Sequence, residues 1–407
     1  MAADDRDERS GALQEAGRFS CREFLVRHIE DILRFYVPRV KDPAGGFHQN
    51  FYIDGRQFNQ ELKQIVSSAR LVINFMLSGK LLNRPDLLEL GKHGLDFLDA
   101  FHLVADGELY AFTLRDNKPD DMTQHAYGYA FVLAAHAAAR LAGVTSSGEG
   151  LGRVFDLMER RFWLPDHCAY ADSMSPDGVL DAYRGQNSNM HICEALILAH
   201  RATGEDRYIE RAEILAETFV QRLAAKSGGF VWEHYTSNFD IDWDYNKNDR
   251  TNIYRPWGFQ PGHQIEWTKN LLNICRHTRK DWMLQRAREL FDRAFAIAWD
   301  DLHRGLVYGF GPDEQWCDAD KYFWVQAESM ASAALLYEAT GDAKYKDRYE
   351  ALWSYICAHW VDHEHGAWYC FKQTRDNRRC SDEKAISGAK CDYHPLVSCI
   401  EALNAFP

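Results

Sequence analysis

The stretch SGGFVWEHY, residues 227–235, is one of six short aromatic stretches that recur along the chain. Each is anchored on one position, and these positions are Gly46, Gly107, Cys168, Gly229, Gly305 and Gly366. Subtracting neighbouring numbers gives intervals of 61, 61, 61, 76 and 61 residues. A fixed period of this length indicates a repeated supersecondary unit. The one longer interval contains a polar and aromatic segment, Tyr235 to Pro261.

Two helices are predicted in each interval, because apolar residues recur at helical spacing. The predicted spans are 62–81 and 84–101, 126–143 and 149–162, 188–203 and 207–222, 262–278 and 282–300, and 323–340 and 345–360. Further helices are predicted at about 20–36 and 394–406, and together they form a sixth pair. The sequence therefore predicts an all-α protein, an (α/α)6 barrel of twelve helices, with the aromatic stretches as short strands or β-hairpins at the loop ends. An open α-solenoid is the alternative, but the chain ends lack the polar capping units that a solenoid needs.

Composition and charge narrow the class of protein. Hydrophobic residues make up 46% of the 407 residues and charged residues 26%, which is typical of a globular chain. The period runs without a break in composition, so a single catalytic domain is predicted over residues 19–407, after a flexible tail of residues 1–18. A net charge of −13 argues against a nucleic-acid partner, whose phosphates need a basic face.

A cytoplasmic location is predicted from the N-terminus and the cysteines. The first residues, MAADDRDERSG, are acidic and lack the apolar region of a signal peptide. The longest apolar run, around Ala130 to Ala139, is broken by His136 and is too short to span a bilayer, which takes ~18 residues. The ten cysteines form no C-x-x-C pair and no metal-type spacing, and buried, reduced thiols are expected.

Polar residues near the starts of the first helices of each pair are the candidate site. In a closed barrel these helices run the same way along the axis, so their N-terminal ends share one rim. In chain order the rim carries Arg70, Tyr127, His191, His263, Glu266, Glu328 and His394. The coincidence of three histidines, two carboxylates and an arginine on one rim favours a catalytic pocket.

Each of these residues also has a structural interpretation. His263 and Glu266 lie three positions apart on one helix face, so they either point into a cavity or pair with each other. His191 and Glu194 repeat this spacing, and Glu194 is interpreted as a structural partner. Glu328 lies in an apolar helix, where a buried acid needs a reason to be present. No dinucleotide or phosphate-binding motif accompanies them, so no cofactor is predicted.

Five stretches carry a resemblance to a known family: YRGQNSNMHICEA (183–195), DYNKND (244–249), YRPWGFQPGHQIEW (254–267), YFWVQAES (322–329) and DYHP (392–395). In this order and on this repeat, the chain resembles the N-acylglucosamine 2-epimerase superfamily over about Arg22 to Phe406. The segments RGQNSNMH and RPWGFQPGH are most similar in sequence to the mannose and sulfoquinovose isomerase members of the family. The fold of that family is an (α/α)6 barrel, in agreement with the ring inferred from the period.

The resemblance implies roles for the site residues. It gives His394 as the general acid/base at the substrate carbon and His263 as the second histidine, used in ring opening or on the opposite face. It gives Arg70, Asn187, His191, Glu266, Glu328 and Arg255 as substrate-binding or pocket residues. Tyr127 joins them as a substrate-binding candidate from its place on the predicted rim. The chain departs from some relatives at Tyr129, where they have histidine, and at Gln64 to Val66, where a tryptophan is frequent. The pattern that binds a sulfonate is not evident.

The activity that the resemblance implies is a metal-independent aldose–ketose isomerase that interconverts D-mannose and D-fructose through a cis-enediolate. Histidine titrates near neutrality and suits removal of a weakly acidic proton at C2. The alternatives are a sugar 2-epimerase, acting on mannose/glucose or N-acylglucosamine, and a glycoside hydrolase with Glu266 and Glu328 as its carboxylate pair. The expected partner is a monosaccharide, and the sequence leaves a homodimer open. The segment from Tyr235 to Pro261 is expected to cover the pocket mouth.

Overall fold

The computed structural model describes residues 18–104, 107–144, 147–249, 252–278, 280–388 and 390–406, without the side chains of 147 and 148. The predicted flexible tail therefore lies outside the described residues, apart from Arg18. The described residues form twelve α-helices, as predicted. They are α2 (Arg22–Tyr36), α3 (Ile65–Leu82), α4 (Pro85–Phe97), α5 (Ala126–Leu141), α6 (Ser147–Arg161), α7 (Gln186–Thr203), α8 (Asp206–Ala216), α9 (Pro261–Thr278), α10 (Asp281–Ala298), α11 (Phe323–Thr340), α12 (Ala343–His359) and α13 (Tyr393–Ala405).

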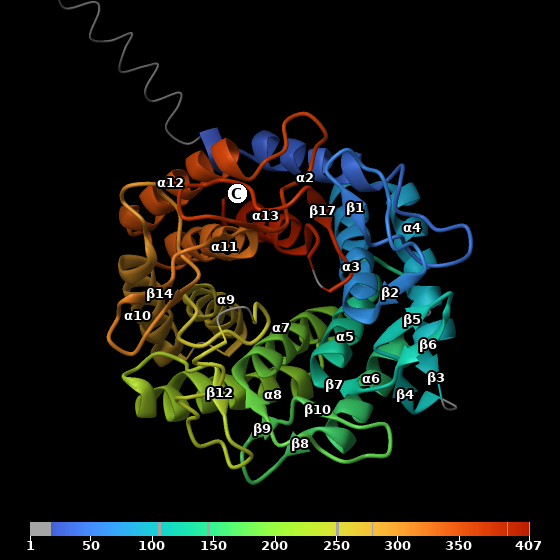
Figure 1. Ribbon diagram of the computed structural model, residues 1–407, viewed down its shortest axis with the longest axis horizontal. Helices are drawn as coiled ribbons and strands as arrows, with labels where there is room; N and C mark the ends of the chain where they lie inside the picture. The colour runs from blue at the N-terminus through green and yellow to red at the C-terminus, as the bar shows by residue number, and fades with distance from the viewer. Residues whose placement is uncertain are drawn as a thin grey trace, which may run out of the picture.

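The helices form two concentric rings (Figure 1). In the inner ring each helix contacts the next, in the order α3, α5, α7, α9, α11 and α13, and α13 returns to contact α3. The outer ring consists of α4, α6, α8, α10, α12 and α2. The first helix, α2, lies beside the last, α13, so the predicted closure of the ring is confirmed and the open solenoid is excluded.

Sequence patterns explain which helices lie inside. In the inner helix α11, every residue from Phe323 to Leu336 is buried, because the helix is enclosed by its neighbours on all sides. In the outer helix α10, the buried residues recur every three or four positions: Met283, Ala287, Leu290, Phe291, Ala294, Phe295 and Ala298. This single apolar stripe is typical of a helix that packs on one face only.

The inner helix α3 also shows how apolar these helices are. Its 18 residues have a mean hydropathy of 1.4, which makes the helix long and apolar enough to cross a membrane, but 78% of it is buried within the protein. Among the described residues it is the only helix with this property. Its burial identifies it as a core helix of the barrel.

Short antiparallel strands join the repeat units at the helix ends. The pairings are β1 (Phe51–Tyr52) with β17 (Glu383–Ala385), β2 (Leu62–Gln64) with β5 (Thr113–Arg115), which pairs with β6 (Lys118–Asp121), β3 (Leu103–Val104) with β4 (Leu109–Tyr110), β7 (Gln124–His125) with β10 (Ser173–Met174), β8 (Trp163–Leu164) with β9 (Ala169–Tyr170), β11 (Arg184–Gly185) with β12 (His234–Tyr235), β13 (Gly309–Phe310) with β14 (Trp316–Asp318), and β15 (Lys321–Tyr322) with β16 (Lys372–Gln373). Besides local hairpins, these include pairs between neighbouring units. The pair β1–β17 joins the start of the barrel to its end.

The repeated position of the aromatic stretches has a common backbone conformation. All six residues have positive φ, at 69° for Gly46, 88° for Gly107, 53° for Cys168, 89° for Gly229, 76° for Gly305 and 85° for Gly366. This left-handed conformation favours glycine, because a side chain clashes with the backbone there. The period in the sequence therefore marks the turn that follows each outer helix.

Amide side chains at or near the inner helices hold the aromatic stretches in place. Each accepts a hydrogen bond from the backbone N–H and donates one to the C=O of a single residue. The pairs are Gln124 with Tyr110, Asn189 with Tyr170, Gln264 with Val231, and Gln326 with Leu306. The repeat thus preserves a specific contact as well as the helical pattern.

Two predicted helices end earlier than expected. The predicted spans 84–101 and 207–222 are α-helical only to Phe97 and Ala216, and then continue as π-helical turns, Leu98–His102 and Glu217–Leu223. A π turn keeps the apolar residues on the buried face, so the sequence pattern does not distinguish it from an α-helix.

We predict that Gly305→Ala lowers the free energy of unfolding by about 2–4 kcal/mol, through backbone strain and overpacking. A Cβ atom at this position, whose φ is +76°, would lie 2.3 Å from a ring carbon of the buried Tyr355. The matched control is Gly341→Ala, where φ is +68° and no described atom lies within 4 Å of the added Cβ. Denaturant unfolding should show a loss of only about 1 kcal/mol for the control. Equal losses in the two variants would contradict the packing argument.

Candidate active site

One pocket opens at the rim formed by the N-terminal ends of the inner helices, and all six inner helices contribute to it. Its lining consists of Arg70, Tyr127, Asn187, His191, Ile253, Tyr254, Gln260, His263, Glu266, Tyr308, Phe323, Trp324, Gly388, Lys390 and His394. Seven of the nine predicted site residues are in this list, the exceptions being Glu328 and Arg255. The shared rim therefore brings together residues that lie far apart in the sequence.

His394, on α13, is held by the carboxylate of Glu328 on α11. Its Nδ1 lies 2.6 Å from Oε1 of Glu328, and both side chains are buried. Burial lowers the pKa of His394 well below its ordinary value, and the nearby charge of Arg70 lowers it further. A neutral imidazole that donates its Nδ1 proton to Glu328 presents Nε2 as a base. Glu328 thus supports His394 from outside the pocket lining.

His263, on α9, has a carboxylate partner of its own that was not predicted. Its Nδ1 lies 2.9 Å from Oε2 of Glu233, which belongs to the stretch SGGFVWEHY. The alternative that His263 pairs with Glu266 is wrong, because Nδ1 of His263 contacts Glu233 instead. His263 and Glu266 both line the pocket. The indole of Trp324 lies between the two histidines, with ring centroids 5.0 Å from His263 and 5.9 Å from His394.

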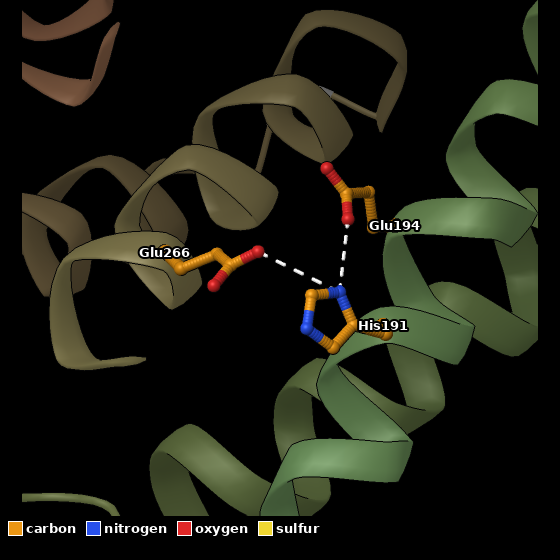
Figure 2. Close-up of side chains that lie close together, drawn as sticks. All are labelled: His191, Glu194 and Glu266. Carbon is orange, nitrogen blue, oxygen red and sulfur yellow. Dashed lines mark hydrogen bonds and ion pairs between the residues drawn. The ribbon is translucent and has the colours of Figure 1, made fainter. Parts of the chain in front are cut away.

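His191, on α7, contacts two carboxylates at once (Figure 2). Its Nδ1 lies 3.1 Å from Oε2 of Glu194 and 3.6 Å from Oε1 of Glu266. Glu194 is thus its structural partner, as expected. Burial lowers the pKa of His191 to about 4, so this imidazole is neutral at physiological pH. His191 also lines the pocket.

Glu266 has an unusual environment for a carboxyl group. Burial, reinforced by the neighbouring Glu328, raises its pKa well above the ordinary value. Among the described residues, neither of its oxygens has a hydrogen-bond partner. A pocket carboxyl group whose oxygens make no hydrogen bond to the described residues is available to bind a hydroxyl group of a ligand.

His191, Glu194 and Glu266 could hold a cation, because their ligand atoms lie within 4.8 Å of one another. However, Nζ of Lys269 lies 2.8 Å from Glu194 and 3.9 Å from Glu266. This ammonium group supplies the positive charge that a metal ion would otherwise provide. The donor set therefore fits a metal poorly.

Arg70, on α3, lies between aromatic rings. Its guanidinium carbon is 4.4 Å from the ring centre of Phe131 and 4.9 Å from that of Tyr393. One of its nitrogens donates a hydrogen bond to the Tyr127 hydroxyl at 2.8 Å. Burial raises the pKa of Tyr127 to about 12, so this hydroxyl stays protonated. The pair presents a fixed positive charge and a hydroxyl group to the pocket.

The mouth of the pocket is formed by two loops. The long interval between Tyr235 and Pro261 contributes Ile253, the half-exposed Tyr254, and Gln260. The loop before α13 contributes Lys390, whose ammonium lies 5.6 Å from the ring centre of Tyr254. The extra segment therefore lies at the pocket, which agrees with its expected position.

Arg255 lines an adjoining cavity rather than the pocket itself. That cavity shares Tyr127, Asn187, Tyr254 and Gly388 with the pocket. The Arg255 guanidinium stacks 3.8 Å from the ring centre of Tyr183 and donates a hydrogen bond to the Tyr245 hydroxyl. In this arrangement it shapes the approach to the pocket.

Sequence reasoning missed Glu233 and Lys269, although each leaves a signal. Glu233 is an acid within an aromatic stretch whose residues from Phe230 to Tyr235 are all buried. Lys269 follows Glu266 by three positions and so lies on the same face of α9. A charged residue on the buried face of an inner helix indicates a charged neighbour in the barrel.

The fold and the pocket together define an (α/α)6 barrel with histidine–carboxylate pairs at the ends of its inner helices. The family model of N-acylglucosamine 2-epimerase matches residues 45–398, and the chain belongs to this family. The chain is 42% identical to a D-mannose isomerase of Marinomonas mediterranea, over 95% of this chain and 98% of that protein. It is 34% identical to a D-mannose isomerase of Thermobifida fusca, over 70% of this chain and 71% of the relative. A crystal structure of D-mannose isomerase superposes with a TM-score of 0.92 at 42% identity, covering 95% of this chain and 99% of the other.

Proposed function

We propose that the protein is a metal-independent aldose–ketose isomerase that interconverts D-mannose and D-fructose. The observation that carries this proposal is the pair of pocket histidines, His394 and His263, each held at Nδ1 by a buried carboxylate. The similarity to D-mannose isomerases along almost the whole chain supports the choice of sugar. The proposed catalytic domain covers residues 19–407.

The proposed reaction begins with opening of the pyranose ring. His263 accepts the proton of the anomeric hydroxyl at Nε2, the C1–O5 bond breaks to give the open aldehyde, and the His263 imidazolium returns this proton to the ring oxygen O5. His394 then removes the C2 proton at Nε2, and the C2–H electrons form the C1–C2 double bond of a cis-enediolate. Glu328 stabilises the imidazolium that this step creates.

The enediolate is the species that the pocket must stabilise. Its negative charge develops on oxygen, where we place the Arg70 guanidinium and the Tyr127 hydroxyl. His394 then returns its proton to C1, the hydroxyl proton on O2 moves to O1, and the C2 oxygen becomes the ketose carbonyl. His191, Glu266 and Asn187 bind the remaining hydroxyl groups.

The glycoside hydrolase alternative conflicts with the geometry. It required Glu266 and Glu328 as a pair of carboxylates facing the sugar. Glu328 instead binds His394 with one oxygen and Lys269 with the other, and it does not line the pocket. A 2-epimerase remains the second candidate, because His263 faces the same pocket and could return the proton to the other face of C2.

We also propose a cytoplasmic location and a monosaccharide substrate, with no nucleic-acid partner and no membrane. All ten cysteines lie among the described residues, and none forms a disulfide, which supports a reducing compartment. The expectation that they are buried holds for Cys193, Cys370, Cys391 and Cys399, but Cys21 and Cys380 are exposed. A homodimer stays a prediction.

Product analysis tests the proposal. The purified protein is incubated separately with mannose, glucose and N-acetylmannosamine, and the products are separated by chromatography. Isomerase activity predicts fructose from mannose at equilibrium proportions. Glucose formed from mannose without fructose would identify an epimerase and contradict the proposed outcome.

A further inference from the structure

We propose that Lys269, on α9, is a positioning residue that keeps Glu328 ionised beneath His394 and thereby sets the lower pH limit of the reaction. This inference rests on the function proposed above. Lys269 is buried and does not line the central pocket, so its effect on the sugar must pass through other side chains.

The ammonium group of Lys269 is linked through one carboxylate to His394 and through another to His191. Nζ of Lys269 lies 2.6 Å from Oε2 of Glu328, whose other oxygen lies 2.6 Å from Nδ1 of His394. Nζ also lies 2.8 Å from Oε1 of Glu194, whose other oxygen lies 3.1 Å from Nδ1 of His191. Figure 2 shows Glu194 between α7 and α9, with one oxygen directed at His191. Each carboxylate therefore bridges Lys269 and one histidine.

The network and the titratable groups around it come from five inner helices, with Glu328 on α11. Besides Lys269, the groups that face Glu328 and His394 are Arg70 on α3, His191 and Glu194 on α7, Glu266 on α9, and Tyr393 on α13. Burial opposes the charge on Lys269, but Glu194 and Glu328 outweigh it and raise its pKa well above the ordinary value. Lys269 is therefore a permanent cation in the barrel.

The charge on Lys269 lowers the pKa of both members of the His394–Glu328 pair. Burial raises the pKa of Glu328, and Lys269 opposes that rise. Burial lowers the pKa of His394, and Lys269 lowers it further. If Lys269 is removed, both groups bind protons more readily. Since the base form of the pair is needed to remove the C2 proton, activity should then be lost at a higher pH as the solution is acidified.

A purely structural role for Lys269 predicts a different result. Loss of a structural ion pair lowers stability and the amount of active protein, but it leaves the midpoint of the pH profile unchanged. The test therefore needs variants that change the charge beside Glu328 without leaving an uncompensated buried carboxylate, which is strongly destabilising.

The test compares wild type, K269M/E194Q and E194Q in kcat and kcat/KM for mannose between pH 4 and 9. The double variant removes one positive and one negative charge, and E194Q keeps Lys269 beside Glu328. Relative to E194Q, from which K269M/E194Q differs only at Lys269, we expect the acid limb of the double variant to move up by about one pH unit or more, the size of the effect of an opposite charge in contact. For E194Q the limb should stay or move down, because Glu194 raises the pKa of Glu328.

A second readout does not depend on turnover. In ¹⁵N-histidine NMR, the His394 ring should titrate at a higher pH in K269M/E194Q than in wild type. Should the double variant not fold, K269Q/E194Q makes the same charge change with a polar amide in place of the apolar chain. An acid limb and a His394 titration unchanged in a folded variant would overturn the role of Lys269. A wild-type protein that does not isomerise mannose would instead count against the proposed function.

Discussion

His394→Ala is expected to lower kcat for mannose isomerisation by about 10²–10⁴-fold, the contribution typical of an acid–base residue that touches the reacting carbon. The variant keeps the pocket but removes the only group that we place at both C1 and C2. KM should change much less, because the other wall residues still bind the sugar. Steady-state kinetics with near-UV circular dichroism as a folding check would measure this.

Glu328→Gln provides the matched comparison for His394→Ala. The amide is nearly isosteric with the carboxylate, but it cannot stabilise the imidazolium, so a smaller loss of kcat is expected. Activity of His394→Ala close to that of wild type would remove His394 from the chemistry, whatever the product.

Arg70→Met should lower kcat/KM by about 10²–10³-fold, the usual effect of removing one donor from a developing oxyanion. Methionine keeps part of the apolar packing between Phe131 and Tyr393 but carries no charge. Arg70→Lys keeps the charge but loses the planar guanidinium group, so its kcat/KM should lie between those of Arg70→Met and wild type. The measurement is the kinetics of all three proteins.

Inhibitor binding separates this effect from general damage to the pocket. A planar hydroxamate that mimics the enediolate should lose affinity in Arg70→Met in parallel with kcat/KM, while a neutral sugar alcohol loses less. Equal losses for the two inhibitors would show that Arg70 acts as a wall residue and not on the transition-state charge.

Much of the fold could be predicted from the sequence because the 61-residue period marks a turn that every repeat unit needs. A left-handed turn follows each outer helix, so glycine recurs at every one of these positions except Cys168. The helix pattern between these turns then fixes the number of pairs, and closure follows from the leftover helices at the two ends. The π-helical turns after Phe97 and Ala216 were missed, since their apolar pattern differs little from that of an α-helix.

The site was partly predictable for the same reason. His263, His394 and Arg70 lie near the starts of inner helices, so the repeat alone places them on one rim. The partner of His263 depends on how the aromatic stretch that carries Glu233 packs on α9, which no spacing reveals. Glu233 reaches His263 across 30 positions, and Lys269 reaches Glu328 across 59. Arg255 precedes α9 closely in sequence, yet its loop turns it toward the adjoining cavity.

The isotope content of fructose formed from mannose in D₂O tests the central claim most directly. If His394 carries the proton from C2 to C1 on one face, the fructose should contain deuterium at C1, in one stereochemical position only. The deuterium content should be below one atom per molecule wherever the original proton returns before exchange. Deuterium at C2 of an aldose product, with no labelled ketose, would contradict the account and assign the protein to 2-epimerisation.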